Sequence, residues 1–197
     1  VLEYPYGCTE QRLSRAYPML VLQKTLQRFA MRRLSSQRIN QAVTQTIQHL
    51  NSVLTRRGLF SYWPGGSSNL SLSAYAISFL VEAQAAGYNI PAHLLGKVTK
   101  ELRRSLRSDA ILSLSNDFLE NRAEIVAALA LAQQHEPTYI RRLFAKRSKL
   151  SLYARSQLLL AMVRDRPRHK RSIWLLTKEL ENRVLLKGVA KSRRFAG

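Results

Sequence analysis

Hydrophobic residues recur every three or four positions over most of the chain, a spacing that predicts α-helices, and the alternation typical of strands is almost absent. Two amphipathic stripes come first and predict two helices. Their members are Leu13, Tyr17, Leu20, Val21 and Leu26, followed by Ile39, Val43, Ile47, Leu50 and Leu54. We expect Gly58 to end the second helix, because glycine commonly terminates helices, and residues 57–68 to form a loop.

Start and stop signals in the rest of the chain predict six further helices. The expected spans are 70–86 before Gly87, 91–107 from Pro91, 117–134 capped by Asp117, 137–148 from Pro137, 151–164 capped by Ser151, and 167–187 from Pro167. Eight helices with short connections form four hairpins. Such a series is compatible with a bundle, a solenoid or a ring of hairpins, and the periodicity alone does not choose between them.

Composition narrows the class of protein. A chain of 197 residues with 46% hydrophobic residues can build one domain with its own core. No run of about 18 apolar residues occurs, so no segment is expected to span a membrane. A single cysteine forms no internal disulfide, and no cysteines or histidines are paired at zinc-ligand spacing, so we expect no metal site. Phosphate-binding loops and hydrolase elbows are also absent.

The most distinctive chemistry lies at the start of the chain, in the sequence Tyr-Pro-Tyr-Gly-Cys-Thr-Glu-Gln of residues 4–11. Pro5 and Gly7 favour a turn that leads into a helix, so Cys8 should lie at the helix N-terminus, where free N–H groups stabilise a thiolate. Gln11 lies three residues later, on the same face of the first turn, within reach of the Cys8 sulfur. Attack of the thiolate on that carboxamide, with loss of ammonia, yields an internal thioester, an acyl donor that survives only where water is kept away.

The eight residues resemble the thioester motif of the alpha-2-macroglobulin and complement family, and especially its bacterial branch. The resemblance implies that Cys8 supplies the thioester sulfur, Gln11 the acyl carbon and Glu10 the acid of the motif. Tyr4 and Tyr6 are candidates for apolar cover. It also implies an all-α fold in which helical hairpins form an α/α toroid, and the chain is short for a complete one. The alternative interpretation is an unmodified cysteine at a helix start.

A second stretch carries the same resemblance. Residues 58–66, Gly-Leu-Phe-Ser-Tyr-Trp-Pro-Gly-Gly, followed by Leu-Ser-Ala-Tyr at 72–75, resemble the aromatic and glycine-rich loop of the family. Trp63 and Tyr62 are therefore expected to shield or border the thioester, while the alternative is that Trp63 and Phe60 pack in the core. Residues 87–91 and 149–155 also resemble the bacterial branch, so the likeness extends over most of the chain.

The resemblance to the family does not extend to the histidines. Some family members use a downstream histidine to pass the acyl group to hydroxyls. None of the four histidines, His49, His93, His135 and His169, lies in a matching motif, and the corresponding region offers Asn121 and Glu124. We expect all four histidines to be solvated surface residues. Transfer is then expected to go directly to amines such as lysine side chains.

The formal net charge of +20 needs its own explanation. Residues 138–197 hold 17 basic and 3 acidic residues, enough to attract nucleic acid or an anionic membrane surface. The aromatic residues there are not spaced as base-stacking platforms, so nucleic acid is not the favoured partner. We expect a solvated basic face, or one that meets acidic neighbouring domains.

Together these observations predict one thioester domain over residues 1–197, cut from a larger multidomain protein and short at its C-terminal side. The resemblance implies a periplasmic or cell-envelope protease inhibitor, possible anchoring through the parent chain, and covalent capture of proteases through their lysines. Such a module acts once and is not a turnover enzyme, and it needs no cofactor beyond its internal Cys-Gln bond. The alternative is a basic helical scaffold that binds nucleic acid or anionic surfaces without thioester chemistry.

Overall fold

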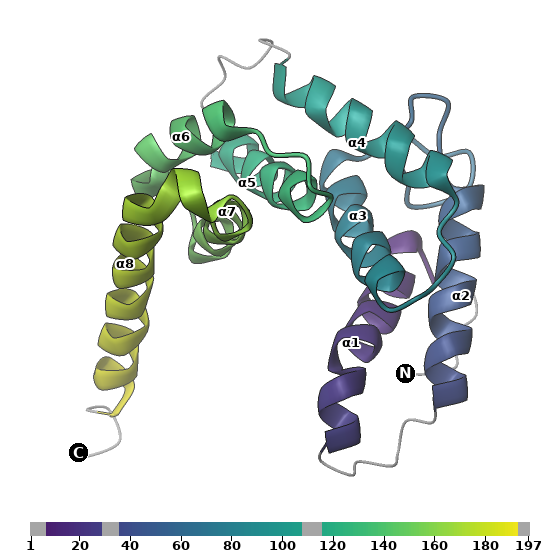
Figure 1. Cartoon of the computed structure of the whole chain (residues 1–197), viewed down its shortest axis with the longest axis horizontal. Helices are drawn as coiled ribbons and strands as arrows, with labels where there is room; N and C mark the ends of the chain where they lie inside the picture. Colours follow the sequence, from purple (N-terminus) through teal and green to yellow (C-terminus); the bar gives the residue numbers. More distant parts are fainter. Residues whose placement is uncertain (1–6, 29–35, 108–115, 193–197) are drawn as a thin grey trace. The chain divides into compact units, whose positions relative to one another are not determined.

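The computed structural model describes residues 7–28, 36–107 and 116–192, with side chains over 7–22, 36–107 and 118–183. Within those ranges the chain forms eight α-helices and one short 3₁₀ turn, η1. They are α1 (Thr9–Arg28), α2 (Ser36–Ser52), α3 (Leu70–Ala85), α4 (Ala92–Arg107), α5 (Asn116–Leu131), α6 (Pro137–Ala145), η1 (Arg147–Lys149), α7 (Leu152–Arg164) and α8 (Arg166–Ser192). The predicted all-helical class is confirmed (Figure 1).

The helices belong to two compact units, a first unit of Val1–Ser108 and a second unit of Asp109–Gly197. In the first unit α1 packs against α2 and α3, and α3 packs against α4. In the second unit α5 packs mainly against α7, which also contacts α6 and α8. Packing between consecutive helices is therefore strong for α1 with α2, α3 with α4 and α7 with α8, whereas α5 packs mainly against α7 rather than against the next helix in the chain.

The core of the first unit comes from the predicted stripes. Leu13, Leu20, Val43 and Leu50 are buried, and α3 is buried on most of its surface, with Phe79 and Leu80 fully enclosed. Three members of the stripes are less buried than predicted. Val21 is 52% exposed, because it lies about 100° around the helix from Leu20 and thus outside the face formed by Leu13, Ala16 and Leu20. Tyr17 and Leu54 are only half-buried, and the side chain of Leu26 lies outside the described residues.

The predicted end of the second helix at Gly58 was also wrong, because α2 ends at Ser52. After the helix the chain makes an isolated β-bridge between Leu54 and Phe60, and Gly58 lies in the tight turn between them with φ of 76°. The Thr55 hydroxyl and N–H both bind the Leu59 carbonyl, which closes this turn. Residues 53–69 form a folded loop that leads into α3.

The helix boundaries in the second unit agree closely with the predictions. The Ser151 hydroxyl accepts a hydrogen bond from the Ala154 N–H, so Ser151 caps α7 as expected. Pro137 is the first residue of α6. The fifth helix starts at Asn116, one residue before its predicted cap Asp117, and ends near Leu131, short of residue 134. The sixth ends at Ala145, and the eighth continues beyond 187 to Ser192.

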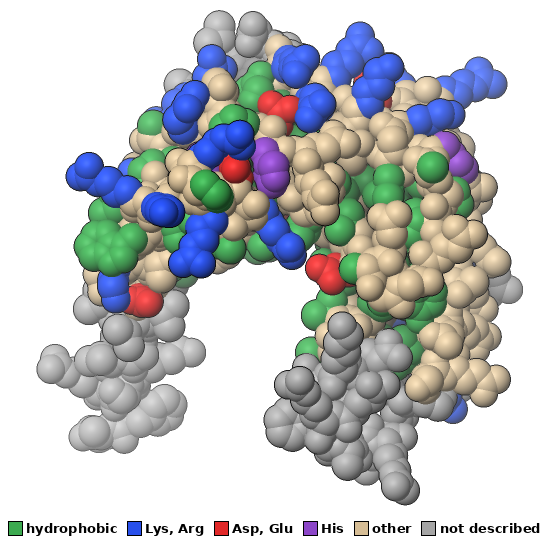
Figure 2. All heavy atoms as spheres, in the orientation of Figure 1, with side chains coloured by type: hydrophobic (Ala, Val, Ile, Leu, Met, Phe, Trp, Pro, Cys, Tyr) green, Lys and Arg blue, Asp and Glu red, His purple; other side chains and the backbone are tan. Residues whose placement is uncertain are grey.

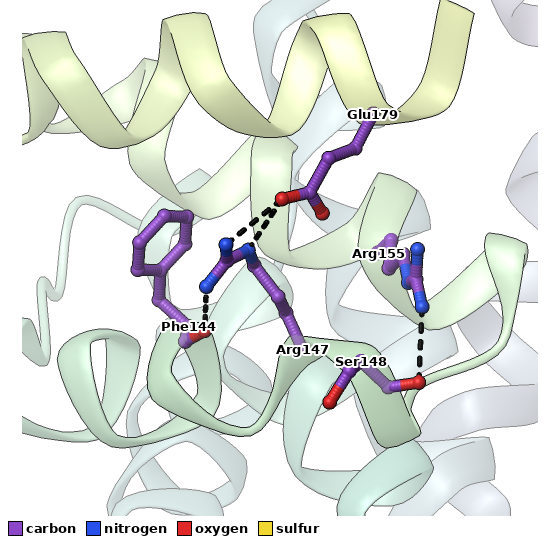
Figure 3. A network of polar contacts seen from close by, with 5 residues as sticks. All are labelled: Phe144, Arg147, Ser148, Arg155 and Glu179. Carbon is purple, nitrogen blue, oxygen red and sulfur yellow. Dashed lines mark hydrogen bonds and ion pairs between the residues drawn. The ribbon is translucent and has the colours of Figure 1, made fainter. Parts of the chain in front are cut away.

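Two arginines hold the connection between α6 and α7 (Figure 3). Arg147 pairs with Glu179 of α8 through two contacts of 2.8 and 2.9 Å, and it lies over the Phe144 ring. Arg155 is 2% exposed, and its guanidinium donates to the carbonyls of Leu150 and Ser148, each at 3.1 Å. Part of the basic character of this unit is therefore structural.

Replacing Arg155 by leucine is expected to lower the free energy of unfolding by about 2–4 kcal/mol, because two carbonyls then lose a charged donor. Urea denaturation measures this loss. Arg164→Leu, at the exposed end of the same helix, is the matched control and should change stability by about 0.5 kcal/mol or less. Equal effects of the two substitutions would contradict the structural role of Arg155.

Candidate functional site

The side chain of Gln11 folds back onto Cys8 at the start of α1. The Cys8 N–H donates to Gln11 Oε1 at 3.0 Å, and the Arg12 N–H donates to the Cys8 carbonyl at 3.1 Å. Cys8 is a half-buried free thiol, and Glu10 is exposed. The carboxamide and the residue that carries the thiol therefore share one turn, as predicted from their spacing.

Gly7 makes room for this arrangement. A Cβ atom at this position would lie 3.1 Å from Gln11 Oε1 and 3.3 Å from Gln11 Cβ, which is tighter than ordinary van der Waals contact. The Gly7 carbonyl accepts a hydrogen bond from Arg12 Nε at 3.1 Å. Glycine therefore lets the Gln11 side chain approach this closely, and a larger residue would push it aside.

Thr9 joins the turn to the aromatic loop and to α2. It is fully buried, and its N–H donates to the Tyr62 carbonyl at 3.0 Å. Its hydroxyl oxygen lies 2.8 Å from the Ser61 carbonyl, 3.0 Å from the Tyr62 carbonyl and 2.9 Å from His49 Nε2. The motif, the loop and α2 therefore meet at one side chain.

Buried polar groups hold the loop that receives Thr9. Ser61 is fully buried, and its hydroxyl contacts the carbonyls of Val53 and Trp63. The N–H of Phe60 donates to the Ser73 hydroxyl at 2.8 Å, which ties the loop to α3. The two carbonyls that bind Thr9 are therefore fixed by the core of the first unit.

The aromatic residues of the loop divide into two groups. Phe60 is fully buried and belongs to the core, whereas Trp63 is 53% exposed and Tyr62 is 38% exposed. The Tyr62 backbone, rather than its ring, makes the hydrogen bonds to Thr9. The other two predicted shielding residues, Tyr4 and Tyr6, lie outside the described residues.

Sequence reasoning missed Thr9 and His49. Thr9 occupies the variable position of the motif, and His49 was assigned to the surface with the other histidines. A signal was present, because Thr46 and His49 lie three residues apart and follow the edge of the apolar stripe that contains Val43, Ile47 and Leu50. Polar residues at such an edge commonly face a neighbouring segment rather than open solvent.

The expectation that all four histidines are solvated was wrong for His169, His49 and His135. His169 is 5% exposed, with Nε2 3.7 Å from Asp165 Oδ2, and His49 is half-buried. Burial lowers the pKa of each imidazole, and the Arg12 guanidinium lowers that of His49 further. His93 is exposed as expected, with Nε2 2.8 Å from Asn51 Oδ1. His135 is half-buried.

Lysine and arginine side chains are unevenly distributed over the surface. On the face shown in Figure 2 they are concentrated over its upper and left parts, and few lie over its lower right part. Most basic residues of α6, η1, α7 and α8 with described side chains are exposed, Arg147 and Arg155 excepted. Among the described residues no cluster of three or more His, Cys, Asp or Glu side chains suits a metal ion. No described helix is long and apolar enough to cross a membrane.

The chain is similar in sequence and in fold to a segment of bacterial alpha-2-macroglobulins. The alpha-2-macroglobulin of Xylella fastidiosa is 34% identical over 122 residues, which cover 61% of this chain and 7% of that protein. No family model matches the chain.

Solved structures agree with the sequence match. The structure of trypsin-activated alpha-2-macroglobulin from Escherichia coli is similar over 89% of this chain and 13% of that one, with a TM-score of 0.74 and 26% identity. Salmonella alpha-2-macroglobulin reacted with methylamine is similar over 89% of this chain and 12% of that one, with a TM-score of 0.73 and 27% identity. This likeness confirms the predicted fold class, helical hairpins of the α/α-toroid type.

Gly7→Ala is expected to displace the Gln11 carboxamide and break its hydrogen bond with the Cys8 N–H, because the added methyl group occupies the space of the Gln11 side chain. Hydrogen exchange of the Cys8 amide, followed by NMR, measures this loss. Gly96→Ala is the control, since a Cβ there meets nothing within 4 Å and should stabilise α4 by about 0.5–1 kcal/mol. Unchanged protection of the Cys8 amide in Gly7→Ala would contradict this account of the turn.

Acid should destabilise the second unit through His169. Burial, Arg141, Arg168 and His135 lower its pKa and outweigh the opposing effect of Asp165, so the unfolded chain binds a proton more readily than the folded one. The stability gained from neutral His169 is present above its ordinary pKa of 6.5 and is lost as the pH falls towards the lowered value. Thermal unfolding of wild type and His169→Leu at about pH 7 and about pH 5 tests this. The variant should lose less stability than wild type, and equal losses would refute the assignment to His169.

Proposed function

We propose that this chain is the thioester domain of a bacterial protease-inhibiting macroglobulin. The observation that carries the proposal is the hydrogen bond of 3.0 Å from the Cys8 N–H to Gln11 Oε1, which holds the carboxamide against the residue with the thiol. The reaction of the Salmonella relative with methylamine supports it, because a small amine is a nucleophile that opens a thioester. The chain spans about 7% of the length of its Xylella relative, so the activity of a whole inhibitor requires other parts.

The turn provides the groups that thioester formation needs. The Cys8 thiolate attacks Cδ of Gln11, and negative charge develops on Oε1. The Cys8 N–H already donates to this oxygen and stabilises the charge, as an oxyanion-hole donor does. The C–N bond of the carboxamide then breaks, the nitrogen takes up a proton, and ammonia leaves. Cys8 Sγ and Gln11 Cδ remain joined.

Capture of a protease consumes this bond. The amine of a lysine attacks Gln11 Cδ, the Cδ–Sγ bond breaks, and the proton lost by the amine neutralises the released Cys8 thiolate. The product is an amide between Gln11 and the target, with one free thiol. Each domain reacts once, so the chain acts as an acylating inhibitor module rather than a turnover enzyme. The Escherichia coli relative is activated by trypsin, which supports a protease as the trigger.

Amines are the expected acceptors. Transfer to hydroxyls requires a histidine that first takes the acyl group on a ring nitrogen. His49 is the histidine nearest the turn, and its Nε2 is engaged by the Thr9 hydroxyl at 2.9 Å. Its lowered pKa keeps the ring neutral and in that hydrogen bond. Lysine side chains of a protease therefore remain the proposed targets.

The remaining expectations follow from this function. We propose that residues 1–197 act as one domain, that Glu10 is the motif acid, and that Trp63, Tyr62, Tyr4 and Tyr6 help to exclude water from the thioester. No cofactor takes part beyond the Cys8–Gln11 bond. The parent protein is proposed to lie in the periplasm or cell envelope. The exposed basic helices then face either its other domains or an anionic membrane surface.

Intact mass spectrometry of the freshly purified protein tests the thioester. Loss of ammonia should leave the mass about 17 Da below that of the sequence, and methylamine should then add about 31 Da and release one thiol. Cys8→Ala should show neither change, and Gln11→Ala should keep a free thiol throughout. An unmodified wild-type mass with a reactive thiol before methylamine would overturn the proposed function.

A further inference from the structure

His49 and Thr9 form a polar junction directly beside the proposed acylating turn. Thr9 follows Cys8 in the chain and is fully buried, so its position determines where the Cys8 backbone lies. The hydroxyl of Thr9 has three neighbours at hydrogen-bond distance, namely two loop carbonyls and the ring nitrogen Nε2 of His49.

The number of available hydrogens decides which group donates and which accepts at this junction. Thr9 has a single hydroxyl proton, and the carbonyls of Ser61 and Tyr62 can only accept. If Thr9 donated its proton to His49, the hydroxyl oxygen of Thr9 would present only lone pairs to the two carbonyl oxygens, which lie 2.8 and 3.0 Å away. No proton would then lie between these oxygens. Donation from Thr9 to the carbonyls, with His49 Nε2–H donating to Thr9 Oγ1, satisfies the contacts. The neutral ring therefore carries its proton on Nε2.

The charges around His49 favour that neutral ring. Arg12 of α1 is the charged group whose field acts on it, and the loop presents the backbone carbonyls of Ser61 and Tyr62 near Thr9. The same arginine donates from Nε to the Gly7 carbonyl, one residue before Cys8. Protonation of His49 would place a second cation beside Arg12 and repel the group that holds Gly7.

We propose that His49 is a positioning residue for the Cys8–Gln11 acylation site, which acts by donating from Nε2 to Thr9 and thereby locking the turn against the aromatic loop. This inference rests on the proposed function. A locked turn keeps Gln11 aligned with Cys8 while the thioester forms, and it limits the openings through which water reaches the bond afterwards. His49 touches neither reacting atom and acts only through Thr9.

Two substitutions separate positioning from a general loss of stability. His49→Leu removes the donor, and His49→Gln retains a neutral amide N–H that can donate to Thr9. His93→Leu is the matched control, because it removes an exposed histidine and its contact with Asn51 from the same unit. The measured quantities are the fraction of molecules with the thioester and the half-life of the bond, both by intact mass, in the whole protein.

We expect His49→Leu to hydrolyse about five to ten times faster than wild type, the factor that corresponds to loss of one buried hydrogen bond. His49→Gln should restore most of the half-life, and His93→Leu should match wild type. A half-life of His49→Leu equal to wild type overturns the proposal. So does equal loss in His49→Leu and His49→Gln while both remain folded, since a residue needed only for packing gives that result.

The pH profile gives a readout that a packing role does not change, and it applies even if His49→Leu fails to fold. In wild type, hydrolysis should accelerate as the pH falls below 6.5 towards the lowered pKa of His49, because protonation repels Arg12 from Gly7. His49→Gln cannot titrate, so this acid acceleration should disappear. An acid limb that persists unchanged in His49→Gln refutes the proposal.

One further measurement distinguishes this inference from the proposed function. If wild type shows no loss of ammonia, the thioester function fails, and hydrogen exchange of the Thr9 amide decides the positioning role alone. That amide donates to the Tyr62 carbonyl and should exchange about five to ten times faster in His49→Leu than in wild type. Unchanged exchange overturns the role of His49 whether or not a thioester forms.

Discussion

The attachment of Thr9 to the loop carbonyls is the interaction on which the candidate site depends. A helix N-terminus has free N–H groups and tends to fray, so a turn placed before α1 has no fixed position of its own. Thr9 removes that freedom, because both its N–H and its hydroxyl bind residues more than 50 positions away in the sequence. The loop is in turn fixed to α3 through Ser73. The turn that carries Cys8 is therefore attached to the core of the first unit through Thr9 and the loop.

This attachment explains why the motif and the aromatic loop occur together in one chain. The loop supplies no charged group to the turn. It supplies backbone carbonyls, which any sequence has, and a backbone path that presents two of them to one hydroxyl. Three features of the loop produce that path. They are the buried Ser61, the hydrogen bond from the Gly66 N–H to the Trp63 carbonyl, and the positive φ of Gly65. The resemblance in sequence thus reflects a requirement on loop geometry more than on the exposed rings of Tyr62 and Trp63.

Helix number, order and most boundaries could be predicted from the sequence because they depend on local signals. Proline at the start of α6 and serine before α7 act within one turn, and the apolar period acts within one helix. The failures depend on distant residues. Gly58 resembles a helix stop, but it lies in a turn held by the pairing of Leu54 with Phe60. Val21 continues an apolar run, but the face that α2 and α3 cover lies elsewhere.

The candidate site shows the same division between local and distant contacts. The hydrogen bond between the Cys8 N–H and the Gln11 carboxamide spans three residues, a local spacing that can be seen in the sequence. His49 lies 40 positions from Thr9, and its role depends on how α2 packs against α1, which no local pattern encodes. The burial of His169 was not predicted for a related reason, because it comes from packing in the second unit.

Several polar residues of this protein are buried and take part in the fold instead of lying at the surface. Histidine and arginine are normally surface residues, and a net charge of +20 encourages that interpretation for every one of them. Arg155 and His169 show that a few are instead built into the fold, where each must be paired or kept neutral. His49 lies between these extremes, half-buried beside Arg12, with its neutral form favoured. A group in that position titrates below the ordinary imidazole pKa of 6.5, so it stays neutral at neutral pH and gains its charge only in acid.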